Sequence, residues 1–434
     1  MVDIDSRDVI RETQSLCPHC LRTLPAVVHE RDGKVYMAKE CPDHGSFDVY
    51  IWPDADHYRW CLTFDFPTRP RNPQTERVHG CPKDCGLCPR HGTWVSLAEI
   101  EVTYRCNMRC PVCFMSAGDP IAEPTFDELV SQMRGIRERE FDGVTLQITG
   151  GEPTVREDLP DLIRAACAEG FGVVELNTNG LILGRDPTYA RVLKEAGCSN
   201  VYLQFDGVTS DVHDALRGPG IHEIKLQAIQ NCRDAGLPVV LSPAIVRGVN
   251  DHQLADIITF AMSNMDVIDG VSFQPAFVSG RFDVDMEQRI TMGDMVAMIE
   301  QQTNGRVKAR DFYPLTCVSP LCDCSTYLIG DGNFYQSLAN SINEDEYRAF
   351  FEDGSTQGSS FVDIAKRKYY GLAPKGMTIL IMCFMDAWTI DTERVARCNL
   401  GVQAHDGRTV PFCAYHITDT SGQRLYPYPL ESRG

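Results

Sequence analysis

The chain has 434 residues, 43% of them hydrophobic and 23% charged, which suits a globular protein of two or three domains. Its formal net charge of −19 argues against nucleic acid as a partner, because phosphate binding needs a basic surface. The N-terminal stretch MVDIDSRDVI lacks the apolar core of a signal peptide. No apolar run approaches the about 20 residues that span a bilayer, so we expect a cytoplasmic protein without a transmembrane segment, leaving peripheral membrane contact open.

The 19 cysteines gather in pairs and triplets, which in a protein that is not exported indicates metal ligation and not disulfides. The first predicted domain, residues 1–95, holds a CPHC pair and a CPDHG knuckle on either side of a short strand-like segment. Their cysteines are Cys17, Cys20 and Cys41. Two such knuckles predict a zinc ribbon or a rubredoxin-like site with one Zn or Fe ion, since both metals accept tetrahedral sulfur. The candidates for the fourth ligand are His44 and Cys61.

A second motif in this domain has three cysteines at spacings of four and three residues, followed by His91. The three are Cys81, Cys85 and Cys88. Closely spaced thiolates typically hold an iron–sulfur cluster, so we expect an auxiliary [4Fe–4S] cluster here, with its fourth ligand from elsewhere in the chain.

The second predicted domain, residues 96–305, alternates short apolar segments with amphipathic helical patterns. The strand-like segments are 97–104, 144–149, 173–177, 201–205, 239–245 and 271–273. A helix pattern over 126–140 starts with a capping box, Thr125 with Glu128. Strand-then-helix units in succession predict an α/β fold with a parallel sheet, in which ligands sit at the carboxyl ends of the strands.

Directly after the first of these segments, Cys106, Cys110 and Cys113 repeat the spacing of four and three residues. Three thiolates leave one iron of a cubane cluster without a protein ligand, and an open position is where a small molecule can react. This stretch resembles the signature of the radical S-adenosylmethionine (SAM) enzymes. The alternatives are a zinc knuckle, a ferredoxin loop and, for the whole chain, a multi-cluster electron carrier.

The resemblance implies a [4Fe–4S] cluster whose open iron chelates SAM, and a partial (β/α)6 TIM-like barrel flanked by cysteine-rich N- and C-terminal metal-binding modules. An electron from ferredoxin or flavodoxin would cleave SAM to methionine and a 5′-deoxyadenosyl radical. For the motif that ends in Cys88, a second SAM-cleaving centre is the alternative to an auxiliary cluster. One departure is Val112, where the family usually has an aromatic residue that contacts adenine; Phe114 follows just beyond.

Polar residues after successive strand-like segments are the candidate SAM contacts. In the family a GGE element binds the amino group of SAM, and it matches Gly150, Gly151 and Glu152 here. The further candidates are Asn177, Asn179, Gln204, Asp206 and Asn250. For Gln204, Asp206 and Asn250 a purely structural role is the alternative.

The third predicted domain, residues 306–434, is again rich in cysteine. Its candidate ligands are Cys317, Cys322, Cys383, Cys398 and Cys413. The thiols outside the central motif suffice for one mononuclear site and two auxiliary [4Fe–4S] clusters, provided that the fold brings the distant ones together.

The order of these modules is similar to that of the archaeal tetraether lipid synthases and of the class D radical SAM methylases. This similarity implies hydrogen abstraction from an unactivated sp3 carbon and C–C bond formation. The first hypothesis is coupling of lipid tails, for which the apolar run 377–384 could line a tunnel or, alternatively, form an ordinary buried strand. The alternatives are methylation of a pterin-like or other small molecule with a folate-type one-carbon donor, and modification of a peptide.

Overall fold

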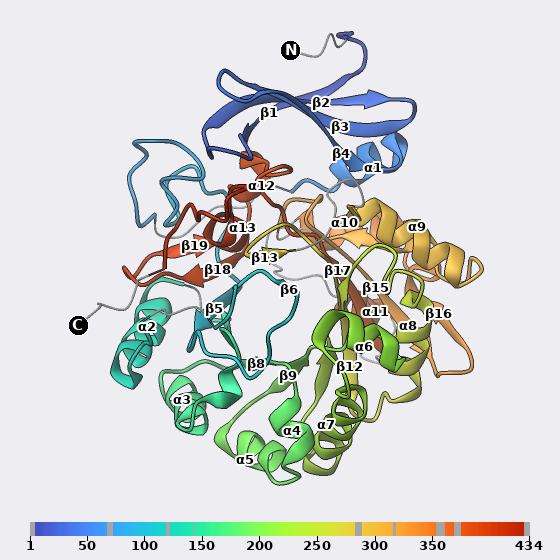
Figure 1. Cartoon of the computed structure of the whole chain (residues 1–434). Helices are drawn as coiled ribbons and strands as arrows, with labels where there is room; N and C mark the ends of the chain where they lie inside the picture. Colours follow the sequence, from blue (N-terminus) through green and yellow to red (C-terminus); the bar gives the residue numbers. More distant parts are fainter. Residues whose placement is uncertain are drawn as a thin grey trace.

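The computed structural model describes residues 5–66, 73–118, 122–140, 142–282, 289–315, 318–352, 361–368 and 375–428. The predicted ligand Cys317 lies outside these residues. A small antiparallel sheet built by the N-terminal part sits above a large curved sheet that carries helices on its outer side (Figure 1).

The N-terminal sheet has four antiparallel strands in sequence order. They are β1 (Val9–Leu16), β2 (Thr23–Arg31), β3 (Lys34–Cys41) and β4 (Gly45–Trp52). Asp32 and Gly33 form the two-residue turn between β2 and β3, both with positive φ, as a tight hairpin with right-handed twist requires. Helix α1 (Ala55–Leu62) follows, and the carboxylate of Asp54 caps its N-terminus.

The large sheet contains 13 strands among the described residues, and its path is β14-β15-β17-β12-β10-β9-β8-β7-β5-β18-β19. Neighbours from β18 to β17 along this path are parallel. Its centre is β5 (Leu97–Glu101), β7 (Thr145–Thr149), β8 (Val174–Thr178), β9 (Asn200–Leu203), β10 (Val239–Leu241) and β12 (Ile268–Pro275). These strands correspond to the six predicted segments, and β11 (Ala244–Ile245) forms the end of the fifth.

Helices cover the outer face of this sheet and follow the strands along the rim in Figure 1. The predicted capping box at α2 is confirmed: the backbone N–H of Glu128 donates to Thr125 Oγ1 over 3.3 Å, and the backbone N–H of Thr125 donates to Glu128 Oε2 over 2.7 Å. The helices are α2 (Phe126–Arg139), α3 (Leu159–Ala168), α4 (Leu181–Arg185), α5 (Tyr189–Ala196), α6 (Ser210–Arg217), α7 (His222–Ala235), α8 (Leu254–Ser263) and α9 (Met292–Gln302).

Residues beyond 305 extend the same sheet at both ends. Strand β17 (Gly376–Met382) pairs in parallel with β12, and β18 (Leu400–Gln403) pairs in parallel with β5. The apolar run 377–384 therefore contributes a strand inside the sheet, as the buried-strand interpretation predicts. The remaining elements are β6 (Val112–Cys113), β13 (Arg281–Phe282), β14 (Tyr313–Pro314), β15 (Asp323–Gly330), β16 (Tyr335–Ser337), β19 (Thr409–Pro411), α10 (Glu344–Glu352), α11 (Phe361–Lys368), α12 (Thr392–Val395) and α13 (Phe412–His416).

The architecture is thus a curved parallel α/β sheet of the partial-barrel kind with a cysteine-rich N-terminal module, as the sequence predicts. The proposed division at residue 305 does not coincide with a break in the sheet. Among the helices that the structure describes, none has the length and apolarity needed to cross a membrane.

Candidate functional site

A cavity of about 220 Å³ opens at the carboxyl ends of the parallel strands. It brings together most of the residues that the sequence singles out for the SAM site. Those that line it are Cys106, Cys110, Cys113, Phe114, Gly150, Gly151, Glu152, Asn177, Asn179 and Gln204. The predicted residues that do not line it are Asp206 and Asn250.

The three central thiols lie on the loop that follows β5. Burial, together with the nearby charges of Glu152, Cys110 and Cys113, raises the pKa of the Cys106 thiol to about 11. The backbone N–H of Met108 donates to Cys106 Sγ over 3.4 Å and opposes this shift. Three neighbouring sulfurs beside a cavity are the donor set that a cubane cluster with one open iron requires, so the residues present fit that group.

Three arginines from distant parts of the chain hold this loop through its backbone carbonyl groups. Arg217 Nη1 donates to Val112 O (3.1 Å), Arg281 Nη1 to Cys110 O (2.8 Å) and Arg424 Nη2 to Phe114 O (2.8 Å). Sequence reasoning misses them, because a contact to a backbone carbonyl leaves no motif. The guanidinium group suits this role, since it carries several donors in a fixed plane.

The two glycines after β7 are needed for a close approach of backbones. A Cβ on Gly150 would lie 2.3 Å from Thr103 O, and one on Gly151 would lie 2.3 Å from Arg105 O. The backbone N–H of Gly151 donates to Thr103 O over 2.7 Å, and that of Glu152 donates to Arg105 O over 2.9 Å. The GGE segment therefore fixes the start of the cysteine loop against the sheet.

The carboxylate of Glu152 joins the ends of two neighbouring strands. It is 1% exposed and accepts hydrogen bonds from the hydroxyls of Thr154 and Thr178 and from the backbone N–H of Asn179. Burial raises its pKa, and these bonds oppose the shift. Asn179 in turn donates to Asn107 Oδ1 on the cysteine loop over 2.7 Å. Contact of Glu152 with the amino group of SAM stays a prediction.

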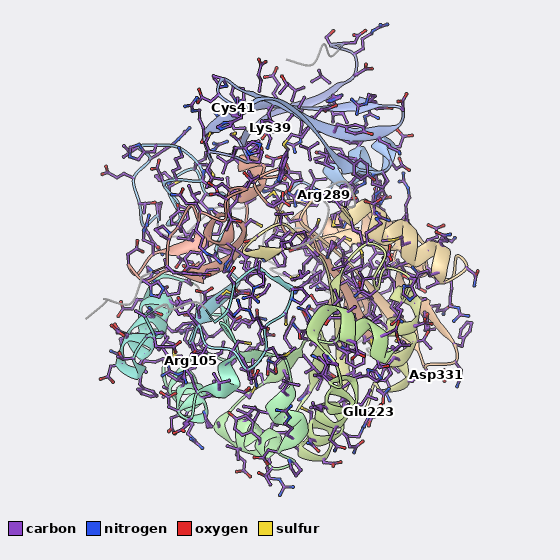
Figure 2. The ribbon with its side chains drawn as sticks, viewed as in Figure 1. Lys39, Cys41, Arg105, Glu223, Arg289 and Asp331 are labelled. Carbon is purple, nitrogen blue, oxygen red and sulfur yellow. The ribbon has the colours of Figure 1, made fainter. Side chains whose placement is uncertain are left out.

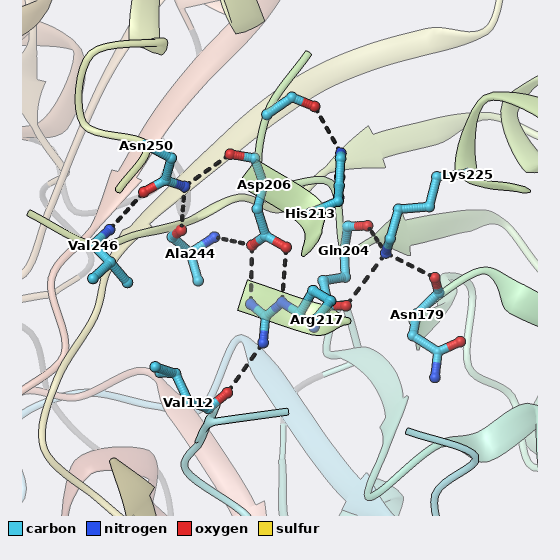
Figure 3. Close-up of polar contacts among 11 residues, drawn as sticks. Val112, Asn179, Gln204, Asp206, His213, Arg217, Lys225, Ala244, Val246 and Asn250 are labelled. Carbon is cyan, nitrogen blue, oxygen red and sulfur yellow. Dashed lines mark hydrogen bonds and ion pairs between the residues drawn. The ribbon is translucent and has the colours of Figure 1, made fainter. Parts of the chain in front are cut away.

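The residues after β9 take part in a buried network of polar contacts (Figure 3). The carboxylate of Asp206 accepts two hydrogen bonds from Arg217, of 2.8 and 2.9 Å, and one from the backbone N–H of Ala244. Asn250 Nδ2 donates to the carbonyl oxygens of Asp206 and Ala244, each over 2.8 Å. For Asp206 and Asn250 the geometry favours the structural alternative.

Gln204 belongs to both the network and the cavity wall. Lys225 Nζ donates to Gln204 O over 2.6 Å and to Asn179 O over 3.0 Å (Figure 3). Burial lowers the pKa of this lysine to about 8. One buried cation thus positions two predicted ligand-binding residues from neighbouring strands.

A polar row crosses the barrel wall deeper in the cavity, and sequence reasoning misses it because its members stand inside strands. Glu99 on β5 is in register with Gln147 on β7, which is in register with Glu175 on β8. Gln147 Nε2 and Asn200 Nδ2 donate to the two oxygens of Glu175, over 2.9 and 3.2 Å. Glu99 lines the cavity, and burial, with the nearby carboxylates of Glu101 and Glu175, raises its pKa to about 8.

In the N-terminal sheet, Cys17, Cys20, Cys41 and His44 place one ligand atom each within 4.8 Å of one another. The Sγ atoms of Cys20 and Cys41 are 4.0 Å apart, and His44 Nδ1 lies 3.4 Å from Cys41 Sγ. A tetrahedral site with Zn–S bonds of about 2.3 Å has edges of about 3.8 Å, so this donor set fits one zinc-sized ion. His44 is therefore the fourth ligand candidate that the fold brings to this site.

The N-terminal sheet with this site, called the ribbon from here on, is anchored to the rest of the molecule. Lys39, labelled beside Cys41 in Figure 2, donates from Nζ to Ser15 Oγ over 2.9 Å and to Trp388 O over 2.8 Å. Arg11 and Thr13 on β1 also donate to the buried carboxylate of Asp391.

The other predicted ligands form two groups. One group, Cys81, Cys85 and Cys88, lines a small cavity together with His91. The second group surrounds Arg394, which donates from Nε to Cys322 Sγ over 3.3 Å and from Nη2 to Cys383 O over 3.0 Å. Its thiols interact electrostatically with one another or with Arg394; they are Cys322, Cys383, Cys398 and Cys413.

Comparison with known proteins gives two family matches. Residues 100–261 match the radical SAM superfamily, and residues 9–53 match the HMPTM N-terminal zinc ribbon domain. A 7,8-dihydro-6-hydroxymethylpterin dimethyltransferase from Methanocaldococcus jannaschii is 35% identical over 97% of this chain and 96% of its own length. A GTP 3′,8-cyclase from Peptoclostridium acidaminophilum is 32% identical, over 41% of this chain and 55% of its own length.

Among solved structures, Streptococcus suis SuiB bound to S-adenosylmethionine is similar with a TM-score of 0.43 and 16% identity, covering 49% of this chain and 48% of that chain. The extent of the dimethyltransferase match decides the family, since it includes the cysteine-rich modules on both sides of the barrel. The chain belongs to the radical SAM superfamily and is an S-adenosylmethionine-dependent enzyme of the branch that contains this pterin dimethyltransferase.

Proposed function

We propose that this enzyme methylates carbon atoms of a pterin-type small molecule, with a folate-type compound as the one-carbon donor. The observation that carries the proposal is the similarity to the dimethyltransferase over nearly the full length of both chains. This similarity favours the methylation alternative over lipid-tail coupling. The lining of the cavity is compatible with a heterocycle that has polar edges, because carboxylate, amide and hydroxyl groups stand in it beside apolar side chains.

When bound, the [4Fe–4S] cluster and SAM together supply the hydrogen-abstracting radical. Cys106, Cys110 and Cys113 would hold the cluster on the loop that the three arginines fix. Gly150 and Gly151 let the backbone after β7 pack against Thr103 and Arg105, which holds the start of that loop in place. Apolar residues close the cavity toward β17 and β18 and exclude water from the reacting carbon; these are Leu97, Met382, Phe384, Leu400 and Phe412.

The remaining metal sites belong to the same proposal. One Zn or Fe ion would bind at the ribbon, and the two further groups of thiols would each hold an auxiliary [4Fe–4S] cluster. For the group around Arg394, four thiols are present in the described residues. For the group of Cys81, Cys85 and Cys88, His91 is a candidate fourth ligand because it lines the same small cavity. Ferredoxin or flavodoxin is the proposed reductant, and the cytoplasm is the proposed location.

The test is an anaerobic assay of the reconstituted enzyme with dithionite, SAM, a methylene-folate donor and 7,8-dihydro-6-hydroxymethylpterin. The expected products are 5′-deoxyadenosine and a pterin heavier by one or two methylene units, both seen by mass spectrometry. A parallel reaction contains archaeal-type isoprenoid lipids. Release of 5′-deoxyadenosine with an unchanged pterin and a coupled lipid would overturn methylation in favour of the first hypothesis.

A further inference from the structure

The polar row across the barrel wall contains two buried carboxylates with different surroundings. Both oxygens of Glu175 accept hydrogen bonds from amide groups of neighbouring strands. Glu99 is 5% exposed and lines the cavity, and among the described residues its carboxyl group has the carboxyl groups of Glu101 and Glu175 nearby but no hydrogen-bond donor. Burial and the nearby carboxyl groups favour the protonated form of Glu99, so its carboxylate form would be stabilised by a ligand that brings N–H donors into the cavity.

The position of Glu99 separates it from the predicted SAM contacts. It stands two residues before the end of β5, whereas Gly150, Glu152 and Asn179 all follow the ends of their strands. A ligand that reaches Glu99 therefore lies deeper in the barrel than the cysteine loop. This is where the second substrate of a SAM-dependent enzyme would meet the radical.

The groups around Glu99 indicate which ligand would satisfy it. The cavity that Glu99 lines also carries amide and hydroxyl groups, which are those of Gln147, Tyr202, Ser242 and Gln274. Its apolar side chains include Leu97, Met382 and Leu400. A planar heterocycle with polar edges fits such a mixed lining. A carboxylate pairs best with two parallel N–H donors, which a 2-amino-4-oxopyrimidine ring presents on its amino and N3–H edge.

We propose that Glu99 is the specificity residue for the substrate and binds the 2-amino and N3–H edge of the pterin ring through both carboxylate oxygens. This inference rests on the proposed function. A guanine base carries the same 2-amino and N3–H edge. The proposed ligand is the pterin, and guanine is the alternative that the experiment tests.

The experiment measures anaerobic binding of 7,8-dihydro-6-hydroxymethylpterin, of an analogue without the 2-amino group and of GTP to the cluster-loaded enzyme. Wild type should bind the pterin at least about tenfold more tightly than the analogue, because the analogue leaves a buried carboxylate oxygen unpaired. In E99Q the pterin should bind about 10- to 100-fold more weakly and the preference over the analogue should vanish. SAM affinity should change less than about twofold.

The matched control is E140Q at the end of α2, another buried carboxyl group whose pKa burial raises but which does not line the cavity, and it should keep wild-type pterin affinity within about twofold. Equal pterin affinity in wild type and E99Q would overturn the role of Glu99 and leave the proposed function standing. A preference for GTP that E99Q removes would keep the role of Glu99 and overturn the pterin. If E99Q fails to fold, the comparison of pterin and analogue on wild type still decides. Equal affinity of wild type for the two compounds would exclude recognition of this edge.

Discussion

The ribbon site and the central cysteine loop both rely on cysteine thiols, but the first is suited to a structural role and the second to a reaction. At the ribbon, three thiols and His44 converge from two knuckles of one sheet, and four ligand atoms close around one position. On the central loop, three thiols line a cavity that is large enough to admit a ligand. A closed set of protein ligands is typical of structural metal sites, and an incomplete set is typical of reactive ones. The number of protein ligands therefore separates the part that stabilises from the part that reacts.

The largest effect is expected on the open site. Replacing Cys110 by alanine should reduce 5′-deoxyadenosine release from SAM and dithionite to the background of the uncatalysed mixture, because the cluster loses one of its three protein ligands. The matched control is Cys167→Ala, which removes an exposed thiol of α3 and should leave the rate unchanged. Retained release in Cys110→Ala, with wild-type iron content, would show that another thiol group is the reactive centre.

The closed site should respond differently. Cys17→Ala should remove the metal of the ribbon and lower the thermal midpoint of a ribbon transition by several degrees or more, since metal binding contributes directly to folding of such modules. SAM cleavage should fall by less than about tenfold, because the central loop is held by arginines outside the ribbon. Metal content and 5′-deoxyadenosine release are measured on the same sample. Loss of cleavage as complete as in Cys110→Ala would remove the distinction between the two sites.

The same contrast explains what the sequence could predict. The three central cysteines lie close together in the sequence, and the ribbon ligands lie at the two ends of one hairpin. Spacing alone therefore predicts both sets. The parallel strands carry buried apolar runs followed by polar residues, which locates Gly150 and Asn179 at the cavity. The thiols around Arg394 come from helix α13, which holds Cys413, and from three separate loops. Only the folded sheet brings these four segments together, so the sequence could suggest the group only by counting thiols.

Two kinds of residue escaped prediction for physical reasons. Arg281 and Arg424 act on backbone carbonyls of the cysteine loop from far away in the sequence, so no local pattern marks them. Glu99 stands in the middle of a strand, where an inward carboxylate is costly and a sequence pattern does not show which face points inward. Asp206 shows why a structural role was the alternative for polar residues at strand ends, because it binds Arg217 and does not line the cavity.

An intermediate effect is expected when the loop keeps its thiols but loses one anchor. Arg281→Gln removes donors to Cys110 O and Ala117 O and should slow SAM cleavage about 10- to 100-fold, because small displacements of reacting groups are costly. The electron paramagnetic resonance signal of the reduced cluster should persist. The control is Arg164→Gln on the exposed face of α3, whose side chain is 53% exposed. A wild-type rate in Arg281→Gln would show that the thiols alone position the loop.

The last effect concerns the pH dependence of stability at a buried carboxyl group that precedes the cysteine loop. Glu101 accepts hydrogen bonds from the hydroxyls of Tyr104, Tyr415 and Tyr428, and burial raises the pKa of its carboxyl group to about 7. In the unfolded chain the pKa returns to about 4.5. Between about pH 4.5 and 7, the folded state therefore keeps a proton on Glu101 that the unfolded state has lost. Ionisation of this group lowers the free energy of unfolding as pH rises, by up to about 3 kcal/mol above pH 7.

The variant Glu101→Gln cannot ionise, so its stability relative to wild type should increase between about pH 5 and pH 8, a change measured as the difference of thermal midpoints at the two pH values. The control is Glu128→Gln at the start of α2. Its hydrogen bonds with Thr125 lower the pKa of the Glu128 carboxyl, so this group stays ionised throughout the range and the effect of its replacement should not vary with pH. If the difference in thermal midpoint between wild type and Glu101→Gln does not change with pH, a nearby positive charge compensates the Glu101 carboxylate. The folded protein would then not favour the protonated form of this group.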